Sequence, residues 1–187
     1  MVWKYKNRTI REGSSWKNDS GVRHPSNWHM WTSSEKQAAG LKEVTLEIPP
    51  DSRLYSWSHR DDGKINKTAR KLDDENAKDS DGKLIKDIDG KQVVNRGVKW
   101  NLKQEVSDQK YKILSQTDWA VIRKADKGTA IPSNIQTHRD AVRTKATAME
   151  SAIDGASDIA AIEALFITYD KDGKQIGILY DWPKLEL

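Results

Sequence analysis

The sequence lacks cysteine and has only one phenylalanine among its 187 residues. Without cysteine it can form no disulfide, thiol nucleophile or thiolate metal site. No stretch approaches the roughly 18 consecutive apolar residues of a membrane-spanning helix. Residues 1–6 alternate apolar and charged side chains, so they do not resemble the apolar run of a signal peptide. These absences predict a soluble protein that contacts no membrane.

Recognisable catalytic signatures are missing too. The sequence contains no Walker loop, dinucleotide-binding glycine pattern, nucleophile elbow or HExxH helix. Its four histidines have no spacing to a carboxylate that indicates a metal site. The Asp-Gly pairs at 81–82, 89–90 and 172–173 fail the EF-hand register, in which oxygen ligands must precede the glycine at fixed positions. We therefore expect no enzymatic activity, no metal and no cofactor.

The charges are numerous and mixed in sign. Charged residues make up 32% of the chain and hydrophobic ones only 36%, which is typical of small cores or of surfaces completed by partner chains, an oligomer included. The net charge of +4 and the pI near 9.1 would suit nucleic acid. However, no block of five like charges occurs, and a phosphate-binding stripe should be clustered. Nucleic-acid binding is therefore only our third hypothesis.

Tryptophan is unusually frequent, with eight residues. Its large apolar area and its N–H suit both small cores and the centres of protein interfaces. Most of the eight are expected to serve as core residues. Trp28, Trp31 and Trp57 stand in loop-like sequence, so we consider them candidates for an interface.

The pattern of residues predicts an α+β fold in three parts, which begin with a β-rich module over residues 1–60. The alternation over 2–10 predicts a strand. A short helix is expected to begin at Ser33 or Ser34 and to end at Gly40, and residues 44–48 predict a second strand that Pro49 stops.

Residues 61–97 are polar and are expected to form an extended hairpin arm or a linker. The pairs Asp62-Gly63, Asp81-Gly82 and Asp89-Gly90 each precede a lysine, and Asp-Gly favours tight turns. Residues 83–86 and 92–94 then predict two strands around the third pair.

Residues 98–187 are expected to form a helical subdomain closed by a β-hairpin. Helices are predicted over 99–116, from Thr117 or Asp118 to Gly128, over the residues from Pro132 to Gly155, and after Ser157. The longest has an apolar stripe of Ile135, His138, Val142, Ala146, Met149 and Ile153. Residues 166–180 predict the closing hairpin.

Two segments also carry a family resemblance. The run from Tyr111 through Thr117-Asp118-Trp119, followed by His138-Arg139-Asp140-Ala141-Val142-Arg143, resembles the C-terminal region of bacteriophage tail assembly chaperones. Residues 21–28 resemble the front end of phage proteins of the same kind. The resemblance covers about half of the chain and omits residues 51–96.

The resemblance implies a tail accessory protein that binds a tail-fibre or baseplate protein in the cytoplasm of the bacterial host. The alternative is a permanent structural component of the virion tail. Within the family segment Trp119, Arg139 and Arg143 match, and each could also simply stabilise the subdomain. The expected partner-binding residues are Trp28, Trp31, Trp57, Trp119, Arg139 and Arg143.

Overall fold

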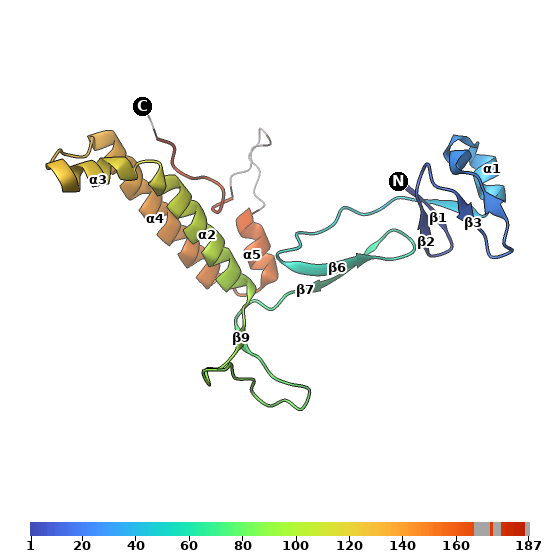
Figure 1. Cartoon of the computed structure of the whole chain (residues 1–187), viewed down its shortest axis with the longest axis horizontal. Helices are drawn as coiled ribbons and strands as arrows, with labels where there is room; N and C mark the ends of the chain where they lie inside the picture. The colour runs from blue at the N-terminus through green and yellow to red at the C-terminus, as the bar shows by residue number, and fades with distance from the viewer. Residues whose placement is uncertain (167–172, 174–176, 186–187) are drawn as a thin grey trace. The chain divides into compact units, whose positions relative to one another are not determined.

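A computed structural model describes residues 1–166, 173 and 177–185 (Figure 1). The fold is α+β, as predicted, with small sheets in the N-terminal part and helices in the C-terminal part. The chain forms two compact units, residues 1–68 and 69–187. The boundary between them falls inside the segment 61–97 that was predicted as an arm or linker.

The first unit contains a three-stranded antiparallel sheet in the order β2-β1-β5. Its strands are β1 (Val2–Tyr5), β2 (Arg8–Ile10) and β5 (Leu41–Val44). The single strand predicted over residues 2–10 is therefore wrong. The chain reverses between β1 and β2, where Lys6 has a positive φ of 54° and only two residues connect the strands.

The core of the first unit is rich in tryptophan. Beside the sheet, β3 (Trp16–Lys17) pairs with β4 (Arg23–His24), and the 3-10 helix η1 (Ser26–Met30) follows. The buried core residues are Ile10, Trp16, Trp28 and Leu41, and the partly buried Trp3, Tyr5, Trp31 and Ala39 pack against them. Because this core is small, a few large aromatic side chains supply most of its apolar area.

Helix α1 (Ser33–Ala38) begins at Ser33, one of the two residues predicted to start it. Thr32 is the N-cap of the helix. Its hydroxyl accepts a hydrogen bond from the Glu35 N–H, and the Glu35 carboxylate accepts one from the Thr32 N–H, the reciprocal arrangement of a capping box. Gly40 follows the helix with a φ of 82°, as its predicted role requires.

The strand predicted over residues 44–48 is wrong, because β5 ends at Val44. The backbone then runs to a second pair of strands, β6 (Tyr55–His59) and β7 (Ile65–Ala69). Glu47 is hydrogen-bonded to the hairpin that these two strands form. Its N–H donates to Gly63 O in the turn, and its carboxylate accepts from the Ile65 N–H at the start of β7. The Asp62-Gly63 turn is thereby confirmed, with a φ of 85° at the glycine.

In the second unit, residues 74–97 form a three-armed loop that we call the clover. Strands β8 (Glu75–Asn76) and β9 (Val94–Asn95) pair as its stem. Beyond the stem, three backbone hydrogen bonds close a ring: Ala77 N–H donates to Val93 O, Val93 N–H to Ile85 O, and Ile85 N–H to Ala77 O, at 2.8, 2.9 and 3.0 Å. The Gln92 amide donates to all three of these carbonyls.

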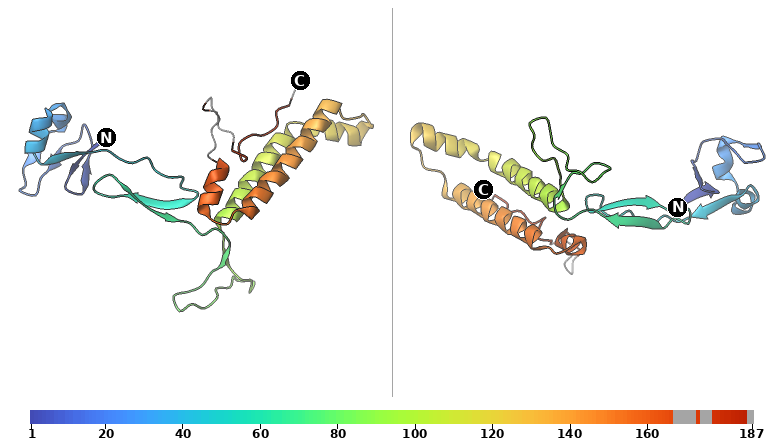
Figure 2. Two further views of the ribbon diagram at one scale, coloured as in Figure 1. Left: turned by 180° about the vertical axis from the view of Figure 1, so that it is seen from behind. Right: turned by 90° about the horizontal axis from the view of Figure 1, so that it is seen from below.

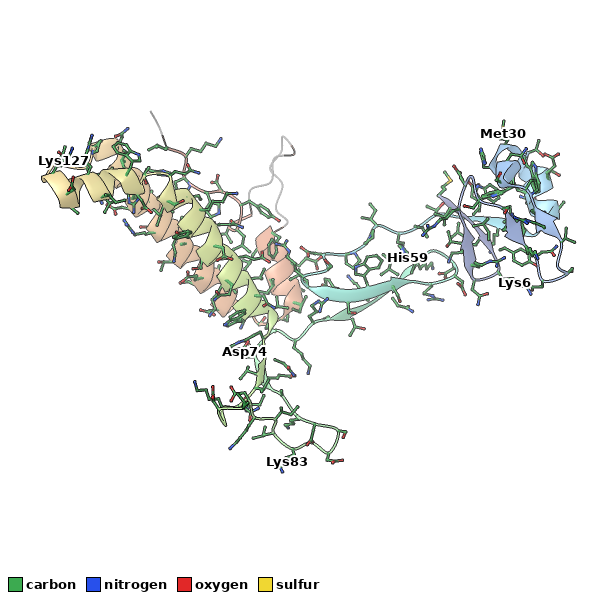
Figure 3. The ribbon with its side chains drawn as sticks, viewed as in Figure 1. Lys6, Met30, His59, Asp74, Lys83 and Lys127 are labelled. Atoms are coloured by element: carbon green, nitrogen blue, oxygen red, sulfur yellow. The ribbon has the colours of Figure 1, made fainter. Side chains whose placement is uncertain are left out.

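The two free arms of the clover are the Asp-Gly turns. Bridges join Lys78 to Leu84 and Lys86 to Gln92. Gly82 and Gly90 have φ values of 80° and 77°, so both turns are confirmed. The single hairpin predicted for this arm is wrong, because both turns form and the ring of hydrogen bonds joins them at a common centre. Figure 3 shows Asp74 at the neck of the clover and Lys83 on an arm.

The helices begin and end within about one residue of their predicted limits. They are α2 (Val98–Ser115), α3 (Asp118–Lys127), α4 (Ser133–Gly155) and α5 (Ile159–Phe166). α2 and α4 lie side by side (Figures 1 and 2). Ion pairs join Lys103 to Asp154 at 2.8 Å and Lys110 to Glu150 at 3.7 Å. The later lysine of α2 pairs with the earlier acidic residue of α4, so the two helices are antiparallel.

All six residues of the predicted α4 stripe are buried. The cap of α5 is Asp158 and not Ser157, since the Asp158 carboxylate accepts a hydrogen bond from Ala161 N at 2.8 Å. Of the predicted closing hairpin, residues 178–180 form a turn, while 167–172 and 174–176 lie outside the described residues. No helix in the described ranges is both long and apolar enough to cross a membrane.

Candidate protein-interaction surfaces

A buried arginine joins three helices at the end of the α2–α4 pair. Arg139 of α4 is only 7% exposed. Its guanidinium donates to Leu114 O at the end of α2 and to Thr117 Oγ1 at 2.8 and 2.7 Å, and it pairs with the Asp118 carboxylate at 2.9 Å. Since Asp118 is the first residue of α3, these contacts fix where α3 starts and how it leaves α2.

Helix α3 shows most of its apolar side chains to solvent. Ala120 is its only buried residue. Trp119 is 50% exposed and Ile122 is 66% exposed, and their spacing of three residues places them on the same side of the helix. The Arg123 guanidinium lies 5.1 Å from the centre of the Trp119 ring. We call Trp119 and Ile122 the α3 surface.

Of the family-segment residues, the structure places Trp119 and Arg139 at the same helix junction, without a direct contact between them. Arg139 pairs with the residue directly before Trp119, so it positions the tryptophan without forming part of the exposed surface. Arg143 lies one turn further along α4, is half exposed, and forms an ion pair with Asp140 of its own helix at 2.9 Å. Arg143 therefore does not take part in the junction at Arg139.

The three tryptophans predicted as interface residues in the first unit differ in exposure. Trp28 is 0% exposed, and its ring N–H donates to Ser14 O at 3.0 Å. It is a core residue and offers no surface to a partner, since burial in the small core outweighs its loop-like sequence context. Trp31 is partly exposed beside that core, and its ring makes an edge-to-face contact with His24. Trp57 is 37% exposed and contacts His59 edge to face.

The ionisable groups with shifted pKa values serve the fold. The pKa of Glu35 is lowered by its hydrogen bonds with Thr32 in the capping box. The pKa of Asp74 is lowered first by the Gly97 N–H and then by Arg96. Both carboxylates are thus kept ionised, whereas a general acid needs a raised pKa. No cluster of three metal-binding side chains occurs in the parts of the chain that the structure describes.

Sequence reasoning missed the exposed Ile122 and the clover. The clover had a signal, because the pattern Asp-x-Asp-Gly-Lys recurs at residues 79–83 and 87–91. In each copy the first aspartate accepts hydrogen bonds from two backbone N–H groups of its own turn, those of the second aspartate and the lysine. Two copies of the same turn sequence, eight residues apart, favour two short hairpins over one long hairpin.

Comparison of the chain with protein-family models, with curated proteins and with solved structures found no match in any of the three. The resemblance to phage tail assembly chaperones therefore stays a prediction.

Proposed function

We propose that this chain is a bacteriophage tail accessory protein that binds a tail-fibre protein through the α3 surface and assists the folding or assembly of the fibre. One observation carries the proposal. Two of the segments that resemble the chaperone family, residues 111–119 and 138–143, meet at Arg139, and the side chain displayed at their junction is the half-exposed Trp119.

The physical role of the α3 surface would be to cover apolar surface on the partner. Fibre chains expose apolar patches and unpaired strand edges until they trimerise, and such surfaces aggregate. A tryptophan held on a short, anchored helix loses little conformational entropy on binding. Truncation of such a central aromatic typically costs about 2 kcal/mol or more of binding free energy. Binding of this kind needs no catalytic group.

The alternative is a permanent structural component of the tail, fibre or baseplate. The observation that favours it is a second exposed apolar region on the clover. There Ile88 is fully exposed and Leu84 is 47% exposed. A protein with separate contact surfaces on the clover and on α3 suits a fixed position between neighbouring subunits.

A capture experiment combined with mass spectrometry separates the two functions. The tagged full-length chain is used to capture partners from phage-infected cells, and purified particles are analysed for the chain. Capture of the fibre protein together with absence from the particle supports an assembly chaperone. Stoichiometric presence in the particle supports the structural alternative. Failure of both contradicts the proposal.

A pair of variants tests the surface itself. Replacement of Trp119 by Ala together with Ile122 by Ser should reduce capture of the fibre protein by tenfold or more, about 1.4 kcal/mol or above. The control is Met30→Ser, which removes an apolar side chain that is 77% exposed on the first unit. Equal loss of capture in both proteins would contradict a role for α3.

A further inference from the structure

The first unit contains a hollow with an unusual concentration of positive charge. Its volume is about 610 Å³, within the range of ligand-binding pockets. It lies between β2 and the β3–β4 pair, and four of its lining residues are cationic: Arg8, Arg11, Lys17 and Arg23. No acidic residue lines it.

Two of these cationic side chains are hydrogen-bonded to other residues that line the hollow. Arg8 donates to the backbone carbonyl of Lys17, which joins β2 to β3 across the hollow. Arg23 donates to Ser15 Oγ at 3.2 Å. The side chains of Arg11 and Lys17 are exposed and have no hydrogen bond or ion pair within the described residues. Two charges in this hollow are thus available to a ligand.

The charge of the chain is also unevenly divided. Acidic and basic residues balance over residues 69–187, so the whole net charge of +4 resides in the first unit. Long-range attraction of an anionic partner therefore acts on the unit that contains the hollow.

The hollow also exposes an unpaired strand edge. β2 is the edge strand of its sheet and pairs only with β1 in the described parts of the chain. In the two-residue hairpin the closing pair Tyr5–Arg8 is the hydrogen-bonded one, so the alternation of antiparallel pairing directs the backbone groups of Thr9 away from β1. Thr9 lines the hollow.

We propose that this hollow binds an acidic peptide segment of a partner protein in extended form, which adds a strand to β2. The backbone of Thr9 would pair with the peptide, and Arg11 and Lys17 would bind carboxylates that alternate along it. Strand addition supplies affinity through the main chain and selectivity through side chains at every second position. The site is separate from the α3 surface and does not depend on the proposed phage function.

A peptide fits the hollow better than nucleic acid does. Single-stranded nucleic acid is held by stacking of bases on exposed aromatic faces. The one aromatic residue that lines the hollow is Trp16, which is 6% exposed and already stacked on His24 at a centroid distance of 4.1 Å. An open strand edge, by contrast, offers a peptide the hydrogen bonds it needs.

Fluorescence anisotropy with the full-length chain tests the proposal. The probe is a labelled six-residue peptide of alternating Glu with Val or Thr. The comparison ligands are the same peptide with Gln in place of Glu, the same peptide with its central amide N-methylated, and an oligothymidylate of six nucleotides. The acidic peptide should bind, and both altered peptides should bind at least about tenfold more weakly.

Two double variants, each of which removes two positive charges, test whether the peptide binds in the hollow. Arg11→Gln with Lys17→Gln should weaken binding of the acidic peptide about tenfold, since two pairs are lost. Lys42→Gln with Lys64→Gln removes two exposed charges outside the lining of the hollow and should leave binding within about twofold.

Several results would overturn the proposal: no binding of the acidic peptide, equal binding of the Gln peptide, equal binding of the N-methylated peptide, or equal weakening by the two double variants. Tighter binding of the oligothymidylate than of the peptide, lost in the Arg11 and Lys17 variant, would also overturn it, because the hollow would then be a nucleic-acid site.

Discussion

The buried guanidinium of Arg139 should be one of the most important single side chains for the second unit. Arg139→Met retains the apolar stem but removes all the donors. The change leaves Leu114 O and the 2% exposed Thr117 without their charged donor and leaves Asp118 without its cation. The helical junction that positions α3 then loses its only charged link to α4 among the residues described.

The size of the effect follows from the burial of each contact. A hydrogen bond to a charged group contributes about 1.5–3 kcal/mol, and the two bonds to Leu114 and Thr117 share one nitrogen of Arg139. The Asp118 carboxylate is 45% exposed, so its ion pair adds less than about 1 kcal/mol. We expect a loss of about 2–4 kcal/mol in the free energy of unfolding.

Urea unfolding followed by circular dichroism at 222 nm measures this loss, because α2 to α5 contain most of the helix in the chain. Arg143→Met is the matched control on the same helix, since it breaks only an exposed pair with Asp140. It should change stability by less than about 0.5 kcal/mol. Equal effects of the two substitutions would refute the role assigned to Arg139.

Three further changes probe the clover. Gly97→Ala should destabilise the second unit by more than about 2 kcal/mol, because a Cβ would overlap the backbone carbonyls of Leu72 and Asp73. Gly155→Ala meets nothing within 4 Å and should be neutral or slightly stabilising; thermal unfolding compares the two variants. Gln92→Leu removes the donor to three carbonyls and should speed hydrogen exchange of the ring amides, with no change in α4. Asp74 has a lowered pKa in the fold, so its contribution to stability is complete above the ordinary pKa of 3.8 and is lost as the pH falls through the lowered one. Protection of the stem amides against hydrogen exchange, corrected for the intrinsic rate at each pH, should fall over this range, and Asp74→Asn should remove that fall.

The helical part was predictable because its signals are repeated many times within each element. The α4 stripe places six residues at three- and four-residue steps, and a single face explains all of them. Gly128, with a φ of 67°, ends α3 as expected. Short strands lack such redundancy. The alternation over residues 2–10 fits one strand or two, and only the conformation of Lys6 and Asn7 decides between them.

The candidate surfaces were only partly predictable. Trp28 and Trp119 are the same residue type, yet one is fully buried and the other half exposed. What separates them is tertiary packing, which places Trp28 against Leu41 and Ile10 from distant strands. The cationic hollow likewise assembles residues from β2, β3 and β4, and no local sequence pattern connects them.

The most direct test of the proposed function is photo-crosslinking from the α3 surface in phage-infected cells. A photoreactive side chain is placed at Ile122 and, as the control, at Met30, which is also well exposed, on the first unit. We expect a crosslink to the tail-fibre protein from position 122 and none from position 30. Crosslinks from both positions to the same mixture of host proteins, or none from 122, would contradict the account.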